Sequence, residues 1–126
     1  MTELEFLQAD PQHPGWRSPL RRALAHAPEG IRDVTAEVGE ADVSALGPAA
    51  GVAGIELDAP FAVRLLARLT DLDLATLPAI GALAHVRVRV ERLDRERYRI
   101  WFPQEYADYL AEVVLDAWEG LAEPTA

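Results

Sequence analysis

The segment 86–102, VRVRVERLDRERYRIWF, constrains the fold more than any other part of the chain. Apolar and polar residues alternate on both sides of a four-residue turn at 93–96. Successive side chains of a strand point to opposite faces, so the alternation predicts an antiparallel hairpin with one apolar face and one polar face. The apolar face is expected to cover the core, and the polar face is expected to carry His85, Arg87, Arg89, Glu91, Arg97, Arg99 and Trp101.

Apolar residues at helical spacing mark two further segments. Residues 60–69 are expected to form a helix with Asp58 as N-cap, Pro60 at its first position and an apolar stripe of Phe61, Leu65, Leu66 and Leu69. The second helix is expected to follow Pro103, to end at Gly120 and to bury Tyr106, Leu110, Val113, Val114 and Trp118.

The remaining segments carry weaker patterns. VAGIELD at 52–58 alternates and predicts a short strand, and another short strand or turn is expected near 31–35. SPLRRALAHA at 18–27 predicts a short helix with Ser18 as N-cap. TDLDLATLPAIG at 70–81 is expected to be a connection.

The order strand, helix, strand, strand, helix predicts an α+β fold: a single ferredoxin-like split βαβ domain with an antiparallel hairpin and two main helices. The closing strand of such a domain is either missing or supplied by the segment near Ile31. We expect the domain to span residues 17–121, between a flexible N-terminal segment at 1–16 and a frayed tail at 122–126.

Charge and composition exclude several classes of function. All twelve basic residues are arginine and no cysteine is present, which excludes disulfides, thiolate metal sites and Schiff-base lysines. A net charge of -9 is a poor match for nucleic acid, whose binding depends on phosphate neutralisation. The acidic N-terminus and the absence of a long apolar run predict a cytoplasmic protein that does not interact with a membrane.

The hairpin nevertheless holds six of the twelve basic residues within 85–110, and it is the main candidate for a functional surface. A strand face that is only exposed to solvent would account for this concentration of arginine without any binding function, since charge on strands discourages aggregation. Exposed Trp among Arg is also typical of contact surfaces, and guanidinium groups bind carboxylates of a partner or of a small anion. The candidate residues for an interface or an anion site are Arg87, Arg89, Arg97, Arg99 and Trp101.

No other part of the sequence predicts catalytic or metal-binding residues. The histidines His13, His26 and His85 lie in unlike contexts, so no metal site is expected. Asp71 and Asp73 are interpreted as helix-start charges and not as an acid–base pair. Neither serine lies in a nucleophile-elbow motif.

Several short signatures resemble the folate-binding aminomethyltransferase superfamily, and within it the gamma subunit of heterotetrameric sarcosine oxidase. The longest is IELDAPFAVRLLARLTDLDLATLPAIG at 55–81, with its Asp-Ala-Pro helix start, Leu-Thr helix end, Asp-Leu step and Leu-Pro. The others are RSPL at 17–20, IRDVT at 31–35 and DYL at 108–110.

This resemblance implies a chain that binds no cofactor and belongs to a larger complex. In that family the larger flavoprotein subunits carry FAD, FMN and NAD, oxidise sarcosine or a similar secondary amine, and pass the methylene unit to tetrahydrofolate. We therefore expect a non-catalytic accessory subunit whose hairpin arginines either dock onto those subunits or pack against the chain's own N-terminal segment. The alternative is a small anion- or folate-binding module that uses the same arginines. A stand-alone enzyme is the least expected of the three hypotheses.

Overall fold

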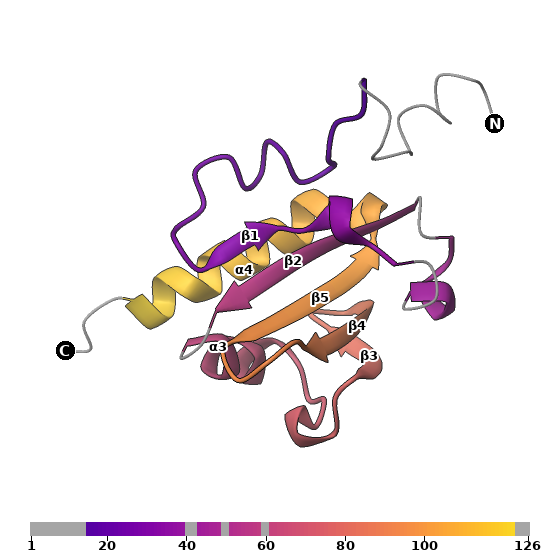
Figure 1. Cartoon of the computed structure of the whole chain (residues 1–126). Helices are drawn as coiled ribbons and strands as arrows, with labels where there is room; N and C mark the ends of the chain where they lie inside the picture. The colour runs from indigo at the N-terminus through magenta and orange to yellow at the C-terminus, as the bar shows by residue number, and fades with distance from the viewer. Residues whose placement is uncertain (1–14, 40–42, 49–50, 59–60, 123–126) are drawn as a thin grey trace.

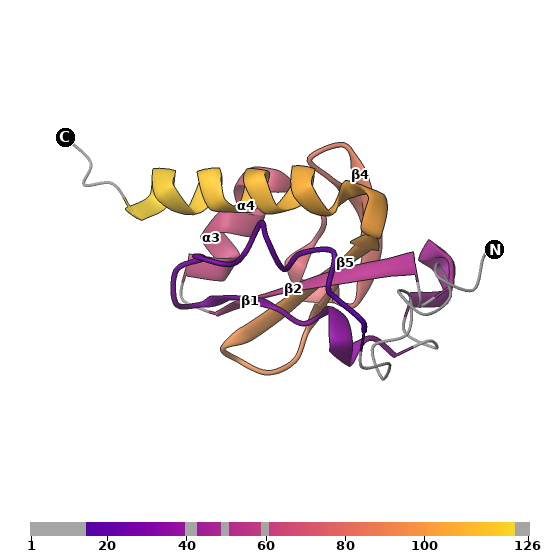
Figure 2. The same ribbon diagram turned by 90° about the horizontal axis from the view of Figure 1, so that it is seen from above.

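The computed structural model describes residues 15–39, 43–48, 51–58 and 61–122, which form an α+β fold. Five antiparallel strands lie in the order β1-β2-β5-β4-β3 (Figure 1). Seen from above, the two labelled helices lie on the same side of the sheet (Figure 2). The elements are β1 (Ile31–Asp33), β2 (Val52–Asp58), α3 (Phe61–Leu69), β3 (Ala79–Leu83), β4 (Val86–Arg92), β5 (Arg97–Pro103) and α4 (Ala107–Ala122).

The expected split βαβ domain is confirmed in the order β2, α3, β4, β5, α4. β1 pairs antiparallel with β2 from Ile31 opposite Leu57 to Asp33 opposite Ile55, and so supplies the closing strand at one edge. β3 adds a fifth strand at the other edge, where it pairs with β4. The segment 70–81, expected to be a connection, therefore contains most of a strand.

The predicted hairpin is also confirmed. β4 and β5 pair with Val90 opposite Ile100, and the alternate residues of both strands are buried on the helical side of the sheet. Leu65 and Leu66 of α3 and Leu110 of α4 pack into the same cluster. Burial of apolar surface is the dominant stabilising term, so this core between the sheet and the two helices is the main source of the fold's stability.

The segment 18–27 was expected to be helical, and that expectation is wrong. It forms consecutive turns, in which the Leu20 N–H donates to the Ser18 hydroxyl at 3.1 Å. Leu20 is fully buried in the core. A ten-residue helix is marginal in water, so the anchoring of Leu20 decides the local conformation here.

Two boundaries of the C-terminal helix differ from expectation. A 3₁₀ turn at Gln104–Tyr106 precedes α4, and Tyr106 is 41% exposed and not part of the buried stripe. Gly120 lies inside the helix, which continues to Ala122. Leu110 and Val114 are buried as expected, while Trp118 packs partly buried against the core.

The start of α3 is described only in part. Pro60, expected at the first helical position, lies outside the described residues. Asp58, expected to be the N-cap, is the last residue of β2. The apolar stripe is confirmed, since Leu65 and Leu66 are buried and Phe61 and Leu69 pack against them.

Candidate functional site

The candidate residues Arg87, Arg89, Arg97, Arg99 and Trp101 are here called the arginine surface. They alternate along β4 and β5 with residues of the core, so they must point to the sheet face away from α3 and α4. Strand register places Glu56 of β2 between Arg32 of β1 and Arg99 of β5 on this face. The structure thus brings the predicted residues together and adds acidic neighbours from other strands.

Glu56 is the centre of this polar layer, because its carboxylate is fully buried. Arg99 Nε donates to Glu56 Oε1 at 2.9 Å, and the Arg32 guanidinium contacts Oε2. Arg99 Nη2 also donates to Glu37 Oε1 at 2.8 Å. The Arg99 side chain, 12% exposed, is therefore held by two carboxylates of its own chain.

Trp101 was expected to be exposed among the arginines, and that expectation is wrong. It is 2% exposed and packs with Val34, Val43 and Val52 in a second apolar cluster on this sheet face. The indole lies directly over Gly54, where an added Cβ would come within 2.2 Å of the ring. The segment after β1 therefore covers this end of the sheet.

A second ion pair accompanies the buried indole. Trp101 Nε1 donates to Glu91 Oε1 at 3.0 Å, and Arg89 donates to the other oxygen of the same carboxylate. The Arg89 side chain is 15% exposed. Glu91 thus neutralises Arg89 and orients Trp101.

Arg97 pairs within the β4–β5 turn. Its Nε and Nη2 donate to Asp94 Oδ2 at 3.0 and 2.8 Å, and the Glu96 N–H donates to Asp94 Oδ1 at 2.8 Å. These bonds, chiefly those from the Arg97 side chain, hold the pKa of Asp94 below its ordinary value of 3.8. The pair is exposed, so it closes the turn and contributes little to stability.

Arg87 differs from the other arginines of this surface. It is exposed, and within the described ranges its guanidinium has no hydrogen-bond or ion-pair partner. Arg87 is therefore the member of the arginine surface that is immediately available to an external carboxylate.

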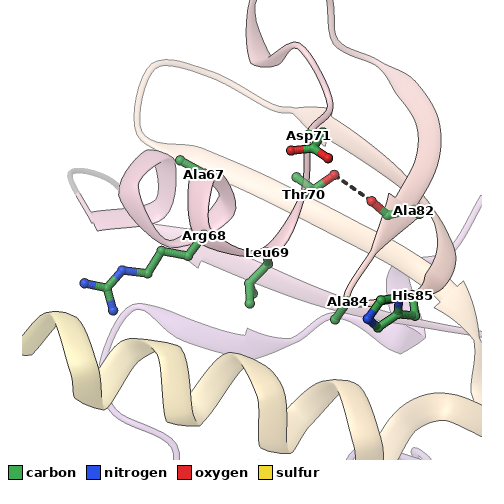
Figure 3. A pocket seen from close by; sticks show the side chains of 8 residues that line it. All are labelled: Ala67, Arg68, Leu69, Thr70, Asp71, Ala82, Ala84 and His85. Carbon is green, nitrogen blue, oxygen red and sulfur yellow. Dashed lines mark hydrogen bonds between the residues drawn. The ribbon is translucent and has the colours of Figure 1, made fainter.

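A separate pocket of about 340 Å³ lies at the end of α3 (Figure 3). The Thr70 hydroxyl in its wall donates to the Ala82 carbonyl at 2.7 Å, and Asp71 and His85 lie on either side. Arg68 lines the pocket with its stem but extends away from His85. The polar groups do not converge on one point, so the pocket carries no specific chemistry.

His85 was expected on β4 and instead lies in the turn between β3 and β4. Ala84 and His85 have φ values of 49° and 71°, as in the two-residue type I′ turns that join tight hairpins. Its side chain therefore does not share the face of Arg87. His13 lies outside the described residues, and among those described no group of three metal-ligating side chains occurs.

Comparison with known proteins shows a structural similarity to a solved protein complex. No family model and no curated protein matches the chain. Among solved structures, the chain is similar to one of heterotetrameric sarcosine oxidase from Corynebacterium sp. U-96, in complex with pyrrole 2-carboxylate. The TM-score is 0.56 at 18% sequence identity, over 62% of this chain and 43% of that chain. The two share a fold. The matched part spans less than half the length of the sarcosine oxidase chain.

The sequence predicts neutralisation of the hairpin arginines by Glu91 and Asp94, which pair with Arg89 and Arg97, but not the pairing of Arg99 with Glu56 and Glu37. Glu56 sits in an alternating strand between Ile55 and Leu57, and the period-two rule already places it on the polar face. The pairing of β2 with β5 was the missing information. No helix within the described part of the chain is long and apolar enough to cross a membrane.

Proposed function

We propose that this chain is a non-catalytic accessory subunit of a sarcosine-oxidase-like, flavin-dependent amine-oxidising complex. The observation that carries the proposal is the shared fold with a chain of heterotetrameric sarcosine oxidase. In this proposal the FAD, FMN, NAD and tetrahydrofolate sites belong to the larger flavoprotein subunits, and this chain binds none of these cofactors.

The arginine surface is the proposed docking face, with Arg87 as its central contact. Arg87 is an exposed cation of β4 with no ion-pair partner among the described residues, whereas Arg89 and Arg99 are held by internal carboxylates. A partner surface that carries a carboxylate would gain a charge-assisted hydrogen bond from Arg87 without breaking an existing pair. Arg97 would lie at the rim, where its pairing with Asp94 is exposed to solvent.

The same contacts make the anion- or folate-binding alternative less favourable. A free carboxylate at Arg99 would compete with Glu56 and Glu37 for the guanidinium, and one at Arg89 would compete with Glu91. Removing an arginine from a buried carboxylate leaves an uncompensated charge, which costs about 3–5 kcal/mol. A macromolecular partner that contacts Arg87 alone avoids this cost.

The test is purification of the tagged chain from its native cytoplasm, with mass spectrometry and visible absorbance of the eluate. A yellow eluate with large flavoprotein chains in fixed proportion is expected. Arg87→Ala should lower the recovered flavin several-fold, while Arg64→Ala, an exposed arginine of α3, should not. A colourless eluate that contains the bait alone would contradict the proposal, and heat released on titration with tetrahydrofolate would favour the alternative.

A further inference from the structure

The outward side of α4 carries a line of carboxylates, here called the acidic stripe. Its members are exposed and lie three or four residues apart, so they share one side of the helix, away from the buried Leu110 and Val114. At the helical rise of 1.5 Å per residue the stripe is about 20 Å long. It consists of Glu105 in the turn before α4 and of Asp108, Glu112, Asp116 and Glu119.

The acidic stripe differs from the carboxylates of the sheet in having no cation beside it. Glu56, Glu91 and Asp94 are each held by an arginine of the same chain. Within the described part of the chain, no carboxylate of the acidic stripe takes part in an ion pair. Its charges are therefore available to a molecule from outside.

The stability of α4 does not account for the acidic stripe. Asp108, Glu112 and Asp116 follow one another at a spacing of four residues, and like charges at this spacing destabilise a helix. Asp116 and Glu119 also lie toward the negative end of the helix dipole, in a helix whose last turn has no basic residue. These charges weaken the isolated helix, so we look for their role in an interaction.

Two exposed tyrosines lie beside the acidic stripe. Tyr106 and Tyr109 are 41% and 44% exposed, and their spacing of three residues makes them neighbours. The Tyr109 hydroxyl donates to the Ala84 carbonyl at 3.0 Å, which holds this ring against the turn between β3 and β4. A tyrosine that is fixed before binding offers a large contact area at a low cost in conformational entropy. This end of α4 therefore combines an aromatic contact with unpaired negative charge.

We propose that this face of α4 docks a protein whose surface carries a row of lysine and arginine side chains. The cations would face the acidic stripe, and Tyr106 and Tyr109 would pack against the apolar stems of the nearest ones. A second copy of this chain does not fit, because it would place one acidic stripe against another. A stripe about 20 Å long also suits a protein surface better than a single small cation.

The proposed partner is additional to the one that contacts Arg87. α4 covers one side of the sheet (Figure 2), whereas Arg87 lies on the other sheet face. The chain would then stand between a surface that supplies carboxylates and a surface that supplies cations. The docking of α4 does not depend on what binds at Arg87.

The absence of lysine from the sequence makes the test specific. A carbodiimide joins a carboxylate to a lysine amine that touches it, and this chain has no lysine to offer. The full chain, purified with its partners from its source cells through a lysine-free tag, is treated with carbodiimide, and the linked residues are mapped by mass spectrometry. We expect links from Asp108, Glu112 or Asp116 to lysines of one co-purified protein.

Substitution of Tyr106 tests the aromatic part of the contact. Tyr106→Ala leaves every carboxylate in place and should lower the yield of these links at least about fivefold, as expected for a tyrosine at the centre of an interface. Leu93→Ala is the matched control, because Leu93 is 40% exposed and lies in the β4–β5 turn. It should leave the yield unchanged.

A pair of charge variants tests the acidic stripe itself. Glu112→Gln with Asp116→Asn should lower recovery of the linked protein about tenfold, and it relieves repulsion within α4, so unfolding would not explain the loss. Asp71→Asn with Glu96→Gln removes the same charge from exposed sites elsewhere and should have little effect.

Three results would overturn the proposal. They are no links from the acidic stripe, links that Tyr106→Ala does not reduce, and an equal loss of the partner in the two charge variants. Arg87→Ala should leave the links from α4 in place even where it removes flavin from the eluate, so docking through Arg87 and docking through α4 fail separately.

Discussion

At the scale of single residues, a carboxylate with no exposed surface lies between arginines of β1 and β5. Glu56→Ala would leave Arg99 partly buried beside a cavity, with only Glu37 as partner. We expect a loss of about 3 kcal/mol in the free energy of unfolding, measured with urea, which is the lower end of the range for breaking a buried pair. Glu96→Ala, an exposed control in the β4–β5 turn, should change it by less than about 0.5 kcal/mol.

The contact between Gly54 and Trp101 gives a second residue-scale prediction. Gly54→Ala would place a Cβ 2.2 Å from Trp101 Cζ3, so the ring must shift. Overpacking of this kind costs about 1–3 kcal/mol, and the tryptophan emission should change with it. Gly51→Ala is the matched control, since nothing lies within 4 Å of its added Cβ. Equal effects of the two substitutions would contradict this reading of the contact.

Asp94 should show the pH dependence of its pairing. Because its pKa in the folded chain lies below 3.8, the pair stabilises the fold above that value and loses its effect as the pH falls through the folded pKa. Arg97→Ala should raise the pKa of Asp94 toward its ordinary value. A carboxyl-carbon NMR titration measures both, and an unchanged pKa in the variant would show that Arg97 is not the main cause.

At the scale of elements, α4 contains a glycine where a helix normally disfavours one. Gly120→Ala should stabilise the chain by up to about 1 kcal/mol through helix propensity. The added Cβ would lie 2.9 Å from Arg68 Nη1, but this is the end of a flexible exposed side chain that can move. Thermal unfolding of the variant measures the sign, and a lower midpoint would mean that the contact with Arg68 outweighs propensity.

The elements also show where sequence reasoning succeeds. The hairpin at 86–102 is predictable because every second residue is large and apolar and its neighbours are charged. β3 is not predictable in this way, because its sequence AIGAL has small or apolar residues on both faces and no alternation of polarity. The turns at 18–27 have helical spacing, but burial of Leu20 by distant segments decides their shape.

The sequence places the residues of the arginine surface on one face of the sheet. It does not show which of them are buried or paired. Alternation puts Trp101 on the same face as Arg99. The burial of Trp101, however, depends on Val34 and Val43, which lie more than fifty residues earlier in the chain. Pairing of the arginines likewise depends on Glu56 and on tertiary register. Such contacts follow from the arrangement of all five strands and not from any local pattern.

At the scale of the whole molecule, the ion pairs of Arg99 bear on the order in which the chain folds. β3, β4 and β5 follow one another in sequence and can pair through local contacts, whereas Arg99 meets Glu56 across 43 residues and Glu37 across 62. Closing long loops is entropically costly and slows folding. The three-stranded meander is therefore expected to form early, and β1 with the segment that covers Trp101 late, so that Glu37→Ala should speed unfolding and leave the folding rate nearly unchanged.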